Sequence, residues 1–179
     1  MLRTVLVMGV MVAAGGAYFR NETLHQRDLV LTKVSTELAN TGAEMRSLGE
    51  APVVWTGLTD SFGRETYLEP LLARFNRGED RRLILLDYRG RLFMEPGGAS
   101  PGPLADLPEV KAAVRDGQDF VGVHADEDGS THFLLVQRVM SPVAEAPVGY
   151  LVASMDAQAL VRDLRLGPDL GLSFGLGSG

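Results

Sequence analysis

Two groups of residues have types and spacing that could support chemistry. The first is Gly98-Ala99-Ser100-Pro101-Gly102, which matches the G-x-S-x-G pattern around the nucleophilic serine of many hydrolases. In those enzymes the backbone N–H of the residue after the serine helps to bind the oxyanion, but Pro101 has no N–H. The segment also has the composition of a proline- and glycine-rich loop. A hydrolase based on Ser100 is therefore disfavoured.

The second group is a pair of histidines, His124 and His132, on either side of the turn sequence Asp128-Gly129. Asp126 and Glu127 stand close by, and imidazole and carboxylate groups are common ligands of transition metals. No pattern fixes these side chains on one face, so we interpret them as exposed turn residues. The sequence predicts no metal and no cofactor.

The composition indicates one globular domain with an acidic body. The 179 residues are 45% hydrophobic and 22% charged, with a formal net charge of -6. Such a chain lacks the clustered lysine and arginine that bind nucleic-acid phosphates, so no nucleic acid is predicted as a partner. The absence of cysteine from the sequence excludes disulfides, Cys-ligated zinc and thiol nucleophiles, and is compatible with an oxidising compartment.

The N-terminal segment is predicted to enter a membrane. Residues 4–19 carry no charge and are flanked by Arg3 and Arg20. As a helix they would be about 24 Å long, slightly short for the hydrocarbon core of a bilayer. We favour a membrane-anchor helix over residues 1–20, and the alternative is a cleaved signal peptide. Either would export the rest of the chain.

A long helix is predicted over residues 21–50. Leu24, Leu31, Leu38 and Met45 recur at intervals of seven, and Ala51-Pro52 breaks the pattern. This helix either packs on its own domain or forms a stalk that pairs with a second copy of the chain. A homodimer would form through the second arrangement.

The residues from 51 to 166 predict a sheet with helices on one side. Hairpin turns are indicated at Arg89-Gly90 and Asp128-Gly129, and Asp106 and Gly117 would cap a short helix between the hairpins. An antiparallel sheet of about five strands with these helices is an α+β fold. Helices are expected over 58–75, 107–115 and 157–166, and strands over 83–86, 91–94, 120–124, 131–140 and 148–155. Residues 167–179 are interpreted as a glycine-rich tail or the cut end of a longer chain.

Two stretches, residues 84–91 (ILLDYRGR) and residues 148–156 (VGYLVASMD) leading into Leu160, resemble one known family. They are similar to the Cache family, the PAS-like extracytoplasmic sensor domains of bacterial transmembrane receptors. The resemblance extends in element order over most of the chain. It implies a membrane helix, a long helix and a PAS-like sheet that binds a small molecule. The family's amino-acid-binding pattern, an arginine followed by Trp-Tyr, is missing because Trp55 stands alone.

The candidate ligand site lies on the sheet face beneath the helix at 107–115. Both alternating faces of residues 131–140 are mostly apolar, which predicts a sheet that is covered on both faces. Arg138, or Gln137 if the phase is opposite, would be the polar residue among apolar neighbours. The other candidates are Tyr150 and Ser154 on the adjacent strand and Tyr88 and Arg91 at the rim.

Asp156 has two candidate roles. By resemblance it is the aspartate that ends the last Cache strand, which makes it a ligand-binding candidate. By position it is the N-cap of the helix beginning at Ala157, and this structural role is favoured.

The function predicted from these features is that of a small-molecule-sensing domain without catalytic activity. It would belong to a bacterial receptor of the kinase, diguanylate cyclase or chemoreceptor type, anchored in the inner membrane by residues 4–19 with its body in the periplasm. Ligand binding would change the packing of the sheet and be passed along the long helix. The alternative is an exported structural or partner-binding module whose signal peptide is cleaved.

Overall fold

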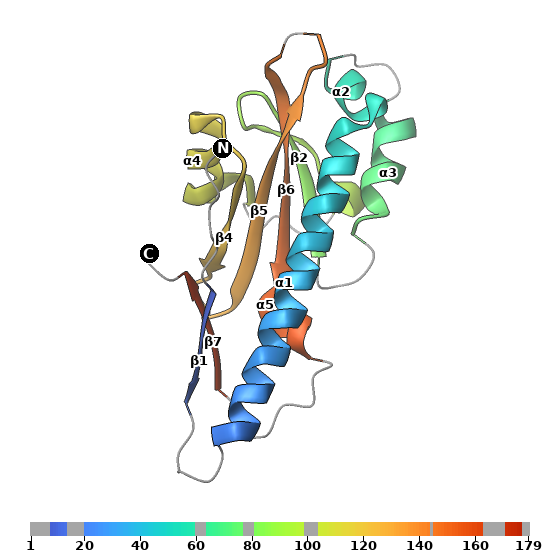
Figure 1. Cartoon of the computed structure of the whole chain (residues 1–179). Helices are drawn as coiled ribbons and strands as arrows, with labels where there is room; N and C mark the ends of the chain where they lie inside the picture. Colours follow the sequence, from blue (N-terminus) through green and yellow to red (C-terminus); the bar gives the residue numbers. More distant parts are fainter. Residues whose placement is uncertain are drawn as a thin grey trace.

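The structure, a computed structural model, describes residues 8–13, 20–59, 64–76, 81–98, 104–143, 145–162 and 171–176. Its centre is a five-stranded antiparallel sheet in the order β3-β2-β6-β5-β4, so the predicted α+β class is confirmed. The strands are β2 (Arg81–Asp87), β3 (Leu92–Met94), β4 (Phe120–Ala125), β5 (Thr131–Met140) and β6 (Pro147–Asp156). In Figure 1 the long helix α1 (Arg20–Glu50) crosses one side of this sheet, and α4 (Pro108–Asp116) lies on the other.

Helix α1 packs on its own domain through one apolar face. Val30, Val34, Leu38, Thr41 and Met45 are buried at spacings of four, four, three and four residues, the pattern of an amphipathic helix. The helix ends at Glu50, and α2 (Pro52–Thr59) begins at the predicted break. Of the two predicted arrangements of this helix, the structure therefore has the one in which α1 packs on its own domain.

The helix predicted over 58–75 as one element is wrong. The described residues there form the end of α2, a π-helical turn η1 (Arg64–Leu68) and the short helix α3 (Glu69–Ala73). Proline fits the first turn of a helix better than its interior. Pro52 accordingly starts α2, and Pro70 lies in the first turn of α3, directly after η1.

Helix α4 has the predicted end and a different start. Gly117 adopts the left-handed conformation at the C-cap, as predicted. The N-cap is Leu107, which makes no side-chain capping bond, so the predicted cap at Asp106 is wrong. Asp106 is the last residue of the adjoining 3₁₀ turn η3 (Leu104–Asp106). Its carboxylate pairs with Lys111 Nζ of α4 at 2.8 Å.

Both faces of the sheet are buried, which corrects the expectation of helices on one side. Phe133, Leu135 and Val139 of β5 belong to the core beneath α1, α3 and α5 (Ala157–Val161), whereas Leu134 and Val136 belong to the core beneath η3 and α4. Alternation along β5 thus divides its side chains between two cores, as the apolar character of both its faces predicts.

The N-terminal apolar segment contains a strand. β1 (Met8–Ala13) pairs antiparallel with β7 (Gly171–Leu176), so the predicted helix is wrong over Met8–Ala13. Short apolar runs do not distinguish helix from strand by periodicity, and valines such as Val10 and Val12 favour extended backbone. The rest of the predicted anchor, and the remaining tail residues, lie outside the described residues. Within the described ranges, none of the helices combines the length and the apolar character that a membrane span requires.

Candidate ligand-binding site

The strand register places four of the predicted site residues on the sheet face that α4 covers. Arg138 is paired with Tyr150, Leu134 with Ser154, and His132 with Asp156 across β5 and β6. Tyr150 and Asp156 are six residues apart on one extended strand, which separates them by about 20 Å. The predicted residues therefore share a face but do not form one site.

Tyr150 anchors α4 to the sheet. Its side chain is buried, and its hydroxyl donates a hydrogen bond to the Val114 carbonyl of α4 at 3.2 Å. Burial raises the pKa of this phenol; Arg138 opposes the shift and Asp119 adds to it. The buried ring and its bond to α4 make Tyr150 a core residue of this face.

Arg138 forms a structural ion pair. Its Nε and its backbone N–H both donate to Asp119 Oδ1, at 3.1 and 2.9 Å. The pair ties β5 to the segment that leads into β4. Gln137 belongs to the opposite side of β5, because its partner Leu151 lies in the α1 core.

Asp156 caps α5, as the sequence favoured. Its Oδ1 accepts the backbone N–H groups of Gln158 and Ala159 at 2.8 and 3.2 Å. Ser154, half-buried on β6, lies in register with Arg82 of β2. Neither residue faces a described cavity.

Apolar side chains fill the space directly between α4 and the sheet. Tyr150 and eight aliphatic residues form this second core in the described part of the chain. The nine buried residues are Ile84, Leu86, Leu104, Val110, Ala113, Leu134, Val136, Tyr150 and Val152.

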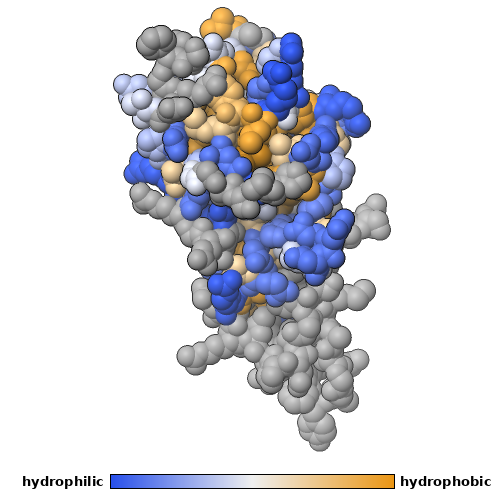
Figure 2. Space-filling model, turned by 180° about the vertical axis from the view of Figure 1, so that it is seen from behind, coloured by the Kyte–Doolittle hydropathy of each residue, from blue (hydrophilic) through white to orange (hydrophobic). Residues whose placement is uncertain are grey.

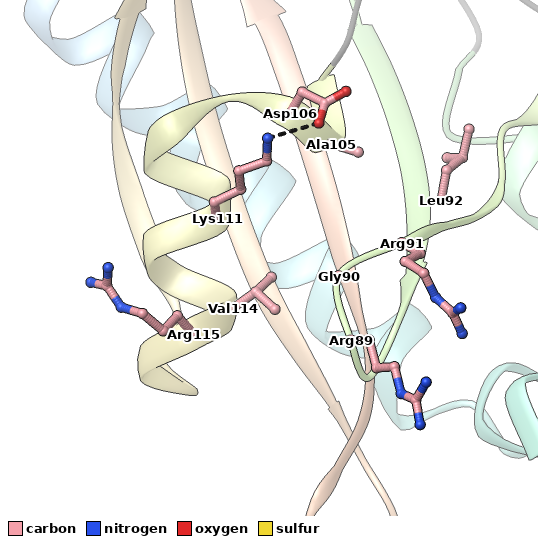
Figure 3. A pocket seen from close by; sticks show the side chains of 9 residues that line it. All are labelled: Arg89, Gly90, Arg91, Leu92, Ala105, Asp106, Lys111, Val114 and Arg115. Atoms are coloured by element: carbon pink, nitrogen blue, oxygen red, sulfur yellow. Dashed lines mark ion pairs between the residues drawn. The ribbon is translucent and has the colours of Figure 1, made fainter.

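A hollow of about 440 Å³ lies beside this core, between the β2–β3 turn and α4 (Figure 3). Of the predicted site residues, Arg91 alone lines it. Three further cations line the hollow that were not among the predicted site residues: Arg89, Lys111 and Arg115. Their spacing is visible in the sequence, because Arg89 shares the turn with Arg91, and Lys111 and Arg115 are four residues apart on α4. The lining consists of Arg89, Gly90, Arg91, Leu92, Ala105, Asp106, Lys111, Val114 and Arg115.

Gly90 allows the turn to approach α4 closely. It has a φ of +78°, and a Cβ at this position would lie 3.0 Å from Val114 Cγ1. The Asp87 carboxylate organises the same turn by accepting the backbone N–H groups of Arg89 and Arg91 and the Arg91 guanidinium, each at 2.9 Å. Burial alone would raise the pKa of Asp87, but these bonds outweigh it and lower the pKa.

The cationic side chains surround the hollow rather than filling it. Figure 3 shows Lys111 directed toward Asp106, and the guanidinium groups of Arg89, Arg91 and Arg115 directed away from the space between the turn and α4. Arg115 pairs with Asp116 at 2.8 Å, and Arg89 lies 5.1 Å from the centre of the Tyr88 ring. Tyr88 itself is 57% exposed and belongs to the outer surface of the turn.

The two histidines form a network that joins α4 to the β4–β5 hairpin. His124 and His132 are direct cross-strand partners, and the Nε2 atoms of both rings approach the Asp126 carboxylate, at 3.4 and 3.0 Å. His124 Nδ1 lies 3.3 Å from Oε1 of Glu109, whose buried Oε2 has no hydrogen-bond partner among the described residues.

The sequence indicates that the two histidines are exposed turn residues, and the structure corrects this. The side chains of His124 and His132 are 19% and 28% exposed. Glu109 of α4 contributes the second carboxylate, whereas Glu127 is exposed. In the part of the chain that the structure describes, no three such side chains are arranged to hold a metal ion.

Comparison with known proteins defines the fold. No family model matches the sequence, and no curated protein is similar to it in sequence. A domain of a sensory box/GGDEF family protein from Vibrio parahaemolyticus is similar in structure, with a TM-score of 0.59 and 17% identity over 83% of this chain and 64% of that one.

The ligand-binding domain of the Campylobacter jejuni chemoreceptor Tlp3 is also similar. Its complexes with L-valine and with 4-methylisoleucine give TM-scores of 0.52 and 0.53 at 14% identity, over 81% and 83% of this chain. The chain covers 65% of each Tlp3 structure and so spans less than two thirds of the domains it resembles. The likeness confirms the resemblance to Cache-type sensor domains at the level of the fold.

Proposed function

We propose that this chain is the small-molecule-sensing domain of a bacterial signalling receptor. The observation that carries the proposal is the likeness of 83% of the chain to a domain of a sensory box/GGDEF family protein and to the ligand-binding domain of a chemoreceptor. A hollow between the β2–β3 turn and α4 provides a place for a ligand on such a fold. The identity of the ligand does not follow from these matches, because folds are shared among many functions.

The hollow is suited to binding rather than to catalysis. Its lining combines aliphatic groups such as Leu92 and Val114 with four cations and one carboxylate. The lining arginines keep their charge and donate hydrogen bonds, which suits them to holding anionic groups. The G-x-S-x-G match at Ser100 gives no support to a hydrolase, because Pro101 cannot donate to an oxyanion.

Strand β6 provides a route from the hollow to α1. The Val114 carbonyl of α4 accepts the hydroxyl of Tyr150, and the next residue, Leu151, belongs to the α1 core. A ligand that moves α4 relative to the sheet would therefore act on both cores through one strand. The change is limited by the difference in ligand affinity between the two arrangements.

The proposal includes attachment to a membrane with the domain outside the cytoplasm. Its support is the fold shared with a chemoreceptor domain. The uncharged residues 4–19 do not add support for a membrane helix, because Met8–Ala13 forms strand β1. The output would be a kinase, a diguanylate cyclase or a chemoreceptor module. Dimerisation would use the exposed face of α1, since its apolar face is buried on the domain. Mass measurement of the N-terminus of the mature protein tests the attachment, because a cleaved segment would contradict an anchor.

A second candidate function is that of an exported module that binds a partner protein. Exposed apolar side chains favour it, among them Leu92 on the short edge strand β3 at 53% exposure and Val143 at 87%. Figure 2 shows apolar surface gathered in the upper part of the face opposite to that of Figure 1, with polar residues around it.

A thermal-shift screen of the full chain tests sensing by direct binding. Amino acids, organic acids, phosphate compounds and metal ions are compared in one buffer. A ligand present at 100 times its Kd stabilises the folded state by about 2.7 kcal/mol, which raises the Tm by several degrees. A folded protein that no compound in any class stabilises would contradict the proposed function.

A further inference from the structure

The hollow beside α4 gathers positive charge on a protein whose net charge is negative. Its lining includes Arg89, Arg91, Lys111 and Arg115 but only one carboxylate, Asp106, in a chain with a formal charge of -6. We infer that this hollow binds a small organic oxyanion, with carboxylate or phosphate groups held by these cations. The inference rests on the proposed function, since it names the chemical class of the ligand.

The cations are available to an incoming anion. The side chains of Arg91, Lys111 and Arg115 are 69%, 61% and 74% exposed, and each is paired with a carboxylate close to it in the sequence. Exposed ion pairs of this kind contribute little to stability because water screens them, so their long side chains exchange partners readily. Lys111 already directs its ammonium group toward the rim at Asp106 (Figure 3).

Arg89 has the greatest freedom to bind an anion. Its described contact is with the ring of Tyr88, and no carboxylate in the described part of the chain forms an ion pair with it. A guanidinium group presents a planar set of N–H donors that fits a carboxylate or a phosphate in two-point contact. Turning from the Tyr88 ring toward the hollow would give Arg89 such a partner.

The size and the apolar part of the lining favour an organic anion over an inorganic one. The hollow measures about 440 Å³, within the range of small-molecule sites, and a lone phosphate would leave most of it to water. Val114, Leu92 and the Cα of Gly90 offer apolar surface to a short carbon skeleton. Anionic groups at the ends of that skeleton would reach the turn on one side and α4 on the other.

Binding of this kind would connect two elements that are distant in the sequence. Arg89 belongs to the β2–β3 turn and Lys111 to α4, and Tyr150 links α4 to the centre of the sheet. An anion held by both cations would draw the turn and the helix together. The movement of the turn toward α4 would depend on the ligand, and it would be the first step of the proposed signal.

The test is calorimetric titration of the full chain with citrate, succinate and inorganic phosphate, at constant ionic strength set by sodium chloride. The double variant Arg89→Gln/Lys111→Gln removes two positive charges, and Arg46→Gln, an exposed change on α1, is the matched control. We expect an organic anion to bind the wild type and the Arg46 variant equally, and the double variant about tenfold or more weakly. Lys111→Arg, which keeps the charge, should retain binding.

The outcomes separate the inference from the proposed function. Binding of inorganic phosphate in place of citrate and succinate, with the same dependence on Arg89 and Lys111, supports the cationic site but overturns the assignment of an organic anion to it. Equal binding by the wild type and a folded double variant overturns the inference, as does an effect that chloride reproduces at the same ionic strength. A neutral compound that binds when no anion does overturns the inference but leaves the sensing function standing. If no class of compound binds, both the inference and the proposed sensing function are overturned.

Discussion

The two faces of the sheet differ in what covers them. Among the described residues, nineteen buried side chains form the core on the α1 face, with α1, α3 and α5 contributing to it. The α4 face buries nine, and polar groups border it: the cationic hollow near Arg89 and Lys111, and the histidine network near Asp126. The α1 face is thus mainly apolar packing, with the ion pair of Arg81 and Glu37 at its border, and the α4 face combines a small core with a cationic hollow and a histidine network.

This difference assigns the two faces different roles. A large, close-packed core resists displacement, whereas a nine-residue helix held by few contacts opens at lower cost. Helix α4 is attached by its small core, by the Tyr150 hydroxyl and by the contact of Glu109 with His124. We therefore assign stability chiefly to the α1 face and response to a ligand chiefly to the α4 face.

Neighbouring leucines on β2 provide the sharpest comparison of the two cores. Leu85 faces α1 and Leu86 faces α4, and both are fully buried. Leu85→Ala should destabilise the domain by about 3–5 kcal/mol, and Leu86→Ala by about 2–3 kcal/mol, because the smaller core relaxes more around a cavity. Urea denaturation of the two variants measures the difference, and a larger loss for Leu86→Ala would reverse the assignment.

Gly90 tests the close approach of the turn to α4. A methyl group there is strained by the positive φ and lies against Val114. Gly90→Ala should cost about 1–3 kcal/mol and weaken anion binding, because the turn must withdraw from α4. Gly129→Ala is the control, since Gly129 also has a positive φ but no atom within 4 Å of its Cβ position. Equal losses of stability for the two variants would show that backbone strain alone is responsible.

The Tyr150 hydroxyl tests how α4 is held. Tyr150→Phe keeps the ring in the core and removes the bond to the Val114 carbonyl, at a cost of about 1 kcal/mol. Hydrogen exchange should quicken in α4 and stay unchanged in α1. Equal acceleration in both helices would contradict the assignment of separate roles to the faces.

The smallest expected effect concerns the pH dependence of the turn. The pKa of the Asp87 carboxyl is lowered in the folded state. Its contribution to the free energy of unfolding is therefore present above the pKa of the unfolded state, near 3.9, and is lost as the pH falls through the pKa of the folded state. Asp87→Asn should reduce stability by less than about 1 kcal/mol at pH 7, since the Arg91 partner is well exposed. The difference between wild type and variant, measured by urea denaturation, should shrink toward pH 3. A difference that grows on acidification would contradict this sign.

Local rules predicted much of the fold. Glycine adopts a positive φ without strain, so the turn at Gly90 and the end of α4 at Gly117 follow from the sequence. Alternation of side chains predicted two buried faces, and the position of Asp156 before Ala157 predicted its capping role. Each of these features depends on residues that are near one another in the chain.

The candidate site depends on contacts that local rules do not contain. Arg89 and Lys111 are 22 residues apart in the sequence, and Glu109 meets His124 only because α4 folds back over the hairpin. The N-terminal segment shows the same limit, since the pairing of β1 with β7 joins the two ends of the chain. Periodicity describes an element but does not identify its partner.

Hydrogen–deuterium exchange of the full chain with citrate, compared with sodium chloride at equal ionic strength, shows which face of the sheet receives the ligand. If the α4 face receives the ligand, citrate should slow exchange in the 88–92 turn and in α4, and leave most of α1 unchanged. Arg89→Gln/Lys111→Gln should abolish that protection. Protection confined to the α1 face, or identical protection in the double variant, would show that the ligand does not bind at the α4 face.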